Sequence, residues 1–181
     1  MILFYKRGDG DMTEIIVEDG SVVENANSYV SVSGVGVYAT DYGYSDWTSA
    51  TDTVKTQSLL RGMRYIEGLN FKGVRANDDQ ELAFPRYDLY DRDGYLLDDD
   101  VIPDRLIDAV CEAAICSLPD TDVDLQPARS RDDYRKKVDI AGVVIEEWYA
   151  SANGLRNNSR VIQDLLVGLV KNSVIVDVER G

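Results

Sequence analysis

The spacing of apolar residues along the chain predicts two helices that are long enough to build a core. The first covers residues 47–69, and Gly68 is placed to end it. Its inward face comprises Leu59, Leu60, Met63 and Ile66.

The second predicted helix covers residues 103–118. Pro103 suits the start of a helix because its missing N–H is not needed there, and Asp104 favours the positive end of the helix dipole. Pro119 follows the last turn and ends the helix. The inward stripe comprises Leu106, Ile107, Val110, Cys111, Ala114 and Leu118.

Two further helices have weaker patterns. Residues 28–43 offer Ser31 or Ser33 as an N-cap, although two internal glycines lower the helix propensity. Residues 160–171 form a short amphipathic segment. Its predicted inward residues are Val161, Leu165, Leu166 and Leu169.

Strand patterns are confined to short segments. Residues 14–20 and 173–178 are typical of short strands, and residues 138–150 form a β-rich run with Gly142 at a bend. The chain of 181 residues has the length of one domain. We therefore expect residues 1–13 to be an extension and 14–181 to be a single domain, with a helical part over 28–120 and a β-rich part over 135–181.

The composition describes an acidic protein with enough apolar residues for a core. Of its residues, 44% are hydrophobic and 29% are charged, and the net charge is −14. Such a surface repels polyanions, so DNA binding is disfavoured unless the basic residues cluster. One short cluster exists, formed by Arg129, Arg131, Arg135, Lys136 and Lys137. A solvated face or a strand edge protected by charge is the favoured interpretation of this run.

The two cysteines and the N-terminus indicate the cellular compartment in which the protein is expected. Cys111 and Cys116 point about 140° apart on one helix, so we expect buried thiols rather than a disulfide, as in a reducing cytoplasm. No apolar run is long enough to span a membrane, and the N-terminus lacks the order of a signal peptide. The protein is therefore expected inside a cell.

Candidate catalytic and metal-binding groups are scarce. The chain has no histidine, which excludes histidine-based triads, and its two cysteines are too few for a zinc site. The glycine run at 34–39 lacks the third glycine of a nucleotide-binding loop, and the run at 91–94 begins like a calcium loop but has Ile102 at the twelfth position. We expect no catalytic residue, metal or cofactor, and a protein that is not an enzyme.

Aromatic residues gather in two regions. The first contains Tyr38, Tyr42, Tyr44 and Trp47, and the second contains Phe84, Tyr87, Tyr90 and Tyr95. Aromatic side chains can stack on bases, but without a basic groove a core or protein-interface role is favoured.

In their order, several motifs resemble one bacteriophage family. They are IIVEDGSVVENANSYVSVS at 15–33, Trp47, SLLRGMRYIEGLNFKGVR at 58–75, QELAFPR at 80–86, DG at 93–94, IPDRLIDAVCEAA at 102–114, LLVGLV at 165–170 and a terminal Arg-Gly. The family is labelled "putative DnaT-like single-strand DNA-binding protein", and its members are similar to head–tail connector, or adaptor, proteins. The resemblance covers nearly the whole chain from Glu14 onward.

The resemblance implies a fold that is mainly α with a small β element (α+β). It would be a bundle of about four helices with a short antiparallel sheet. Adaptors of this kind form a homo-oligomeric ring of about twelve copies, by analogy with portal proteins. The ring lies in the virion neck, with the portal above and a tail protein or second connector below. Phage DNA would pass through without specific binding, and assembly would take place in the host cytoplasm.

The same resemblance suggests which residues contact partners. An apolar terminus, Ile2, Leu3, Phe4 and Tyr5, is expected to dock on a neighbouring subunit or the portal. Phe84, Pro85 and Arg86 set one helix against another, and Arg86 is expected to pair with an acid of this chain or a neighbour. Phe84 and Pro85 could equally seal the core of the monomer. The C-terminal candidates are Val174, Ile175, Val176, Val178 and Arg180.

A rival function follows from the family's label. In it, the chain binds single-stranded DNA during phage replication, through the basic run at 129–137 and the tyrosines.

Overall fold

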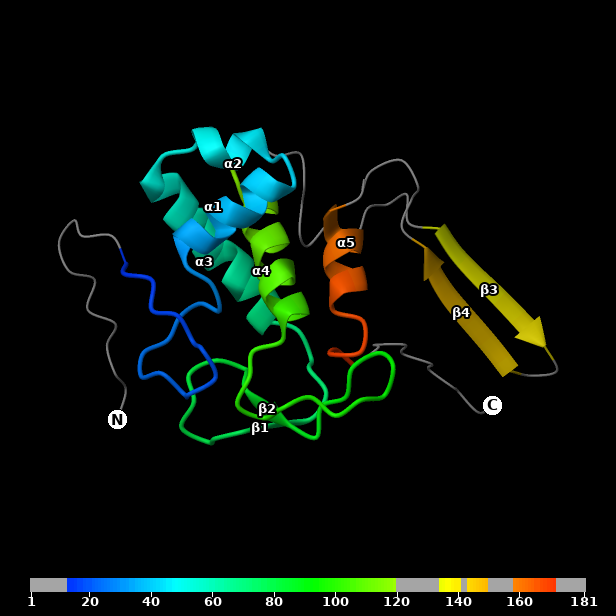
Figure 1. Ribbon diagram of the computed structural model, residues 1–181. Coiled ribbons are helices and arrows are strands. Elements are labelled where there is room, and N and C mark those ends of the chain that lie inside the picture. Colours follow the sequence, from blue (N-terminus) through cyan, green and yellow to red (C-terminus); the bar gives the residue numbers. More distant parts are fainter. Residues whose placement is uncertain (1–12, 120–133, 141–142, 150–157, 172–181) are drawn as a thin grey trace, which may run out of the picture.

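The computed structural model describes residues 13–119, 134–140, 143–149 and 158–171 (Figure 1). The described helices are α1 (Val32–Asp41), α2 (Ser45–Ser49), α3 (Asp52–Glu67), α4 (Asp104–Cys116) and α5 (Asn158–Leu165). The strands are β1 (Val74–Arg75), β2 (Arg86–Tyr87), β3 (Tyr134–Ile140) and β4 (Val143–Tyr149), in two antiparallel pairs. The predicted α+β class, mainly helical with little sheet, is confirmed. None of the described helices is long and apolar enough to cross a membrane.

Helix α4 is the centre of the core, with α3 on one side and α5 on the other (Figure 1). Helix α1 also packs against it. The predicted stripe was therefore too narrow, since Ala109, Ala113 and Ile115 outside it are buried as well, while Ile107 inside it is only half-buried. Cys111 and Cys116 are both buried thiols of this helix, as expected.

The helix predicted over residues 47–69 is in fact two helices. Ala50 is extended, with φ −69° and ψ 151°, and separates α2 from α3. Thr51 then caps α3 by accepting from the Val54 amide, and Gly68 ends α3 as predicted. A capping threonine with an acid after it favours a new helix start over continuation of the old one.

Helix α1 is regular despite its glycines. Ser31 is the N-cap, and its hydroxyl accepts from the Gly34 amide at 3.0 Å. The helix begins at Val32 rather than at residue 28. Gly36 lies over Trp47, because a Cβ there would be 3.9 Å from the indole Nε1. Trp47 itself is buried.

The buried face of helix α5 is shifted by about one residue from the predicted face. Ile162, Leu166 and Leu169 are buried, whereas Val161 is exposed and Leu165 is half-buried. The helix also spans Asn158–Leu165 rather than residues 160–171.

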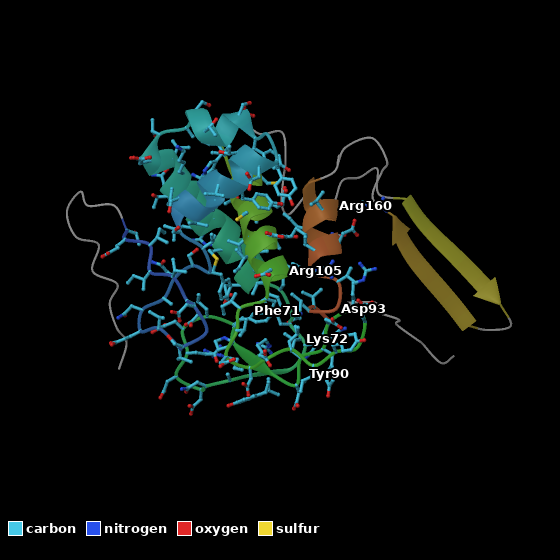
Figure 2. The ribbon with its side chains drawn as sticks, in the orientation of Figure 1. Phe71, Lys72, Tyr90, Asp93, Arg105 and Arg160 are labelled. Atoms are coloured by element: carbon cyan, nitrogen blue, oxygen red, sulfur yellow. The ribbon has the colours of Figure 1, made fainter. Side chains whose placement is uncertain are left out.

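After α5 the chain turns back along residues 70–72, near the labelled Phe71 and Lys72 (Figure 2). Phe71 and Val170 form an isolated antiparallel bridge, and the Lys72 amide donates to the Leu169 carbonyl at 2.8 Å. Gly168 makes this turn with φ +96°, a conformation that favours glycine. These contacts fix the C-terminal part of the described chain on the loops below α3.

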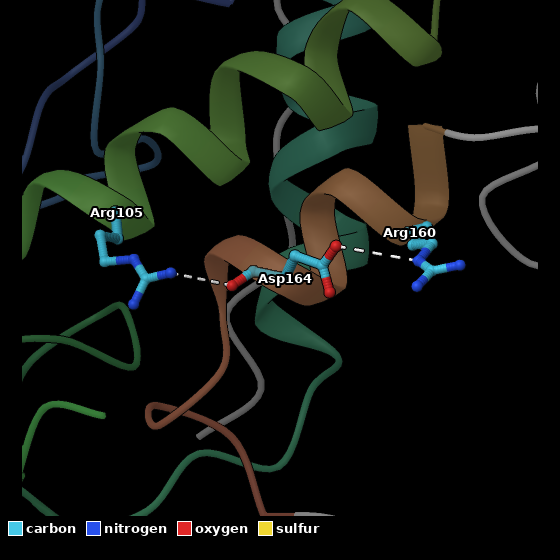
Figure 3. Close-up of polar contacts among 3 residues, drawn as sticks. All are labelled: Arg105, Arg160 and Asp164. Atoms are coloured by element: carbon cyan, nitrogen blue, oxygen red, sulfur yellow. Dashed lines mark hydrogen bonds and ion pairs between the residues drawn. The ribbon is translucent and has the colours of Figure 1, made fainter. Parts of the chain in front are cut away.

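A side chain of α4 also reaches the backbone of α5 (Figure 3). Arg105 donates from Nη2 to the Asp164 carbonyl at 2.9 Å. The nearby ion pair between Arg160 and Asp164 is 3.9 Å long, and both side chains are largely exposed. Exposed pairs of this kind contribute little stability, and the hydrogen bond from Arg105 is exposed as well.

The β elements differ most from the prediction. Residues 14–20 form no strand; Val17 makes one isolated bridge to Ser28. Instead, the buried Glu18 carboxylate accepts from the amides of Gly20, Val22 and Val23 and so shapes a loop.

The β-rich run at 138–150 belongs to a hairpin that begins earlier, at Tyr134. Gly142 and the strand predicted at 173–178 lie outside the described residues.

Candidate functional site

The loop that contains Phe84 is anchored in an aromatic corner below α3. Phe84 is completely buried, and its ring meets Phe71 at 4.9 Å and Tyr29 at 6.1 Å between centroids, both edge to face. Pro85, joined to Phe84 by a cis peptide bond, is also buried. Both residues thus pack inside this chain, and any contact with another protein stays a prediction.

A polar network completes the corner. The Tyr29 hydroxyl donates to Glu67 Oε1 at 2.5 Å and accepts from the Phe84 amide at 3.0 Å. Glu67 Oε2 accepts from the Ala83 amide at 2.9 Å. Burial raises the pKa of both Tyr29 and Glu67, and the carboxylate beside the phenol raises the pKa of Tyr29 further. The network joins the segment before α1 to the end of α3 and to the loop.

Arg86 holds the other side of this loop. Its guanidinium donates to the carbonyls of Lys72 at 2.7 Å, Ala83 at 2.9 Å and Gly73 at 3.0 Å. The expected partner was an acid, but these contacts are to backbone oxygens. The planar guanidinium of arginine can donate to all three carbonyls at once. Arg86 therefore fixes β1 and β2 relative to the Phe84 loop.

On this support stands a row of exposed aromatic and aliphatic side chains, which we call the aromatic strip. Val74 and Tyr87 are register partners across β1 and β2, and Tyr90 bridges to Leu96. Tyr95 follows in the same turn. The strip comprises Val74 (62% exposed), Tyr87 (45%), Tyr90 (51%), Tyr95 (74%) and Leu96 (62%). Figure 2 shows Tyr90 at the end of the molecule opposite α1 and α2. Exposed apolar residues that gather in one region of a surface are typical of a binding site.

The turn within the strip is built by Asp91. Its carboxylate accepts from the amides of Asp93 at 2.9 Å and Tyr95 at 2.8 Å, and Gly94 has φ +90°. The run at 91–94 thus forms a turn. In the described part of the chain, no group of three or more metal-ligating side chains is assembled.

Charged residues accompany the strip along the chain. Residues 88–100 contain six aspartates and one arginine, a net charge of −5. Near β1 stand Lys72 and Arg75, both of which are exposed. We call the charged residues of 88–100 the acidic border of the strip.

The first aromatic group serves mostly the core. The buried Glu112 carboxylate of α4 accepts from the hydroxyls of Tyr38 at 2.8 Å and Tyr44 at 2.9 Å. Burial, followed by the hydrogen bond to Glu112, raises the pKa of both phenols. Tyr42 is exposed, and its ring lies 4.4 Å from that of Tyr38.

The basic run lies partly on the hairpin. Arg135, Lys136 and Lys137 occupy β3, in register with Trp148, Glu147 and Glu146 of β4. Two of the three basic residues are thus matched with acids across the pair. Arg129 and Arg131 lie outside the described residues.

The remaining predicted interface residues belong to the two ends of the chain. Both terminal groups lie outside the described residues: Ile2, Leu3, Phe4, Tyr5, Val174, Ile175, Val176, Val178 and Arg180. Conversely, sequence reasoning missed Tyr29 and Glu67, which are 38 residues apart and carry no common motif. It also missed the hairpin, although two β-type runs around Ala141-Gly142 were a usable signal.

Comparison with protein-family models gives a match. Residues 13–181 match the model of a family described as "Putative DnaT-like ssDNA binding protein". Curated proteins and solved structures give no significant match. The match covers all but the first twelve residues and agrees with the family label that the motifs suggested. The chain therefore belongs to the family of DnaT-like single-stranded-DNA-binding proteins, as that description names it.

Proposed function

We propose that this chain is a structural adaptor, a non-catalytic protein that joins the phage portal to the tail as a homo-oligomeric ring. The observation that carries the proposal is the aromatic strip with its acidic border, at 88–100. Exposed tyrosines and aliphatic residues on a rigid support suit a protein partner. A net charge of −5 beside them disfavours a phosphate backbone.

The net charge of the whole chain agrees with this role. A protein with a charge of −14 repels DNA, so acidic residues along a channel would let the duplex slide without condensing on the wall. In the proposed arrangement the portal lies above the ring, a tail protein or second connector lies below it, and the assembly belongs to the neck of the virion.

The second candidate is binding of single-stranded DNA, and the family description supports it more directly than it supports the ring. Its residue basis would be the β3 segment Arg135–Lys137 together with exposed tyrosines such as Tyr90 and Tyr95. Bases stack on aromatic rings, and basic side chains neutralise phosphates. The acids in register with Lys136 and Lys137, and the acidic border of the strip, weaken this candidate.

One paired experiment separates the two functions. Fluorescently labelled single-stranded DNA is titrated with the protein at about 20 mM and at about 200 mM salt, and immobilised portal protein of the same phage is titrated in parallel. Portal binding without DNA binding supports the adaptor. DNA binding that weakens steeply with salt, without portal binding, overturns the adaptor and establishes the second candidate.

Matched variants assign each result to a surface. Tyr90→Ala should weaken the binding of a protein partner on the strip, whereas Tyr42→Ala, also exposed but at the C-cap of α1, should not. Lys136→Glu with Lys137→Glu should lower DNA affinity and reduce its salt dependence if the β3 segment binds phosphates.

A further inference from the structure

The first residues of the chain combine an apolar run with two basic residues. Residues 2–5 read ILFY, and Lys6 and Arg7 follow them directly. No acid stands among residues 2–7; the two aspartates of this end come later, at positions 9 and 11. We call residues 2–7 the N-terminal arm. The arm precedes residues 13–181, which match the family model, so the features shared by the family do not account for it.

The aromatic strip has the complementary composition. Val74 and Tyr87 are partners across β1 and β2, and Tyr90 and Leu96 are partners across an isolated bridge, so the exposed side chains stand in cross-strand pairs. Carboxylates accompany these pairs, because five of the six aspartates of the acidic border are exposed; the sixth, Asp91, is half-buried and holds the turn. Such a surface suits a segment that is both apolar and basic.

Charge selects the N-terminal arm over the other apolar end of the chain. Residues 173–178 are also rich in apolar residues, but they contain Asp177, and Glu179 follows. These acids would meet the aspartates of the acidic border, and like charges in contact disfavour binding. The arm brings two positive charges and no negative charge to the same surface.

The link between the arm and the described chain is short. The five residues that follow the arm can span at most about 20 Å before the described chain begins at Thr13. There the chain is held in place, because the Glu14 carbonyl accepts from Asn27 Nδ2 at 2.8 Å. Figure 2 shows this beginning, in blue, at the left of the helical body, whereas Tyr90 and Asp93 lie at the lower right. The separation favours the strip of a neighbouring copy over the strip of the same copy.

We propose that the N-terminal arm of one copy binds the aromatic strip of a neighbouring copy, and that this is a subunit contact of the assembly. The inference rests on the proposed ring and names the two surfaces that build it. Residues 2–5 pack on the exposed side chains of the strip, and Lys6 and Arg7 face the acidic border. A contact between two unlike surfaces is the kind that closes into a ring.

The contact is small. Four apolar and two basic residues bury less area than a stable interface between two proteins needs. The contact between two free copies is therefore weak, and the ring reinforces it because each copy is held at two sites at once.

A weak contact calls for photo-crosslinking of the full-length protein. The photo-reactive residue p-benzoylphenylalanine replaces Tyr5, and ¹⁵N-labelled and unlabelled copies are mixed and irradiated, both with and without the portal protein. We expect products that join position 5 of one isotopic form to residues 87–101 of the other. The same probe at Tyr42, which is exposed at the C-cap of α1, is the control and should give at least about tenfold less of this product.

Variants of the strip test whether its charge and its aromatic residues bind the arm. Asp98→Asn with Asp99→Asn, and separately Tyr90→Ala, should each lower the mixed-isotope product about tenfold. All three residues are exposed, and circular dichroism checks that the variants are folded. Asp41→Asn with Asp46→Asn is the matched control, because it removes the same charge from exposed positions of α1 and α2. It should lower the product less than about twofold.

A charge exchange gives independent evidence and shows that the contact joins two copies. Lys6→Glu with Arg7→Glu should lower the product about tenfold, and Asp98→Lys with Asp99→Lys should do the same. Mixing the two variants, with the probe on the copy that carries the acidic arm, should restore the product to within about threefold of wild type.

Several results would overturn the inference: products only within one copy, products only outside residues 87–101, no product with or without the portal, or equal losses from the strip variants and the control. The proposed function has its own readout. Portal binding without the arm crosslink rejects the subunit contact and leaves the adaptor intact, while the crosslink without portal binding leaves a self-associating protein and rejects the adaptor.

Discussion

Gly62 of α3 lies against the backbone of α4 at Ala114. A Cβ placed on Gly62 would be 2.6 Å from the Ala114 nitrogen and 2.8 Å from the Ala113 carbonyl carbon. Both partners are backbone atoms in the middle of a helix, so they cannot rotate away as a side chain could. The two helices approach as closely as they do because residue 62 has no side chain.

Gly62→Ala should therefore destabilise the protein although alanine is the better helix former. Alanine gains about 1 kcal/mol of helix propensity, but the clash forces α3 and α4 apart at a cost typical of overpacking, about 1–3 kcal/mol or more. Gly43→Ala is a poor control because its φ is +78°. Gly36→Ala is the better one, since its Cβ makes only ordinary contacts and should be neutral or stabilising. Urea unfolding measures both; equal stability of Gly62→Ala and the parent would refute the tight crossing.

Glu112 should contribute to stability through its two tyrosine partners. Removing the carboxylate in Glu112→Ala leaves the hydroxyls of Tyr38 and Tyr44 without their acceptor and leaves a gap in α4, so we expect a loss of about 1–3 kcal/mol. Glu112→Gln keeps one acceptor oxygen and should lose roughly half as much. The free energy of unfolding of these variants is also measured in the background of Tyr38→Phe with Tyr44→Phe, which completes a double-mutant cycle. Additive losses would show that the contacts carry no coupling energy.

The pKa of Tyr29 predicts a loss of stability at alkaline pH. Burial, with Glu67 beside it, raises the pKa of this phenol in the folded protein above the value of about 10 in the unfolded chain. A raised folded pKa gives stability that is complete below pH 10 and is lost as the pH rises further. The loss approaches about 1.4 kcal/mol per pH unit for one group.

Tyr29→Phe should make the pH dependence shallower above pH 10, while lowering stability at pH 8 through the lost contacts to Glu67 and Phe84. The measurement is the free energy of unfolding by urea between pH 8 and 11. Gly62→Ala removes no titratable group and is the control, so it should keep the wild-type slope. Identical slopes for Tyr29→Phe and Gly62→Ala would contradict the prediction.

Local periodicity predicted the central helices, and its limits are visible in α5. The start of α4 at Pro103 and the caps Ser31 and Gly68 are signals carried by a few neighbouring residues. In residues 160–171 apolar side chains stand at adjacent positions, so Val161 and Ile162 fit the pattern almost equally. The surface of α4 selects Ile162, and that surface comes from another part of the chain.

The aromatic residues of the candidate site could be predicted from the sequence, but which of them are buried and which are exposed could not. The second aromatic group was recognised, but nothing local distinguishes the buried Phe84 from the exposed Tyr87, Tyr90 and Tyr95. The difference arises because Phe71 and Tyr29 form a pocket around residue 84 alone. The break between α2 and α3 was likewise hidden, since a helical pattern continues across Ala50.

Substitution of Arg86 distinguishes a structural role of this residue from a role at an interface. Lysine keeps the charge but cannot donate to the carbonyls of Lys72, Gly73 and Ala83 together, so Arg86→Lys should destabilise by about 1–3 kcal/mol. Its register partner Arg75 is exposed, and Arg75→Lys is the matched control with an expected change below about 0.5 kcal/mol. Urea unfolding measures both. Because Arg86 supports the aromatic strip from below without being part of it, folded Arg86→Lys should still bind the strip's partner within about threefold of wild type. A loss of binding without a loss of stability would instead place Arg86 in the interface itself.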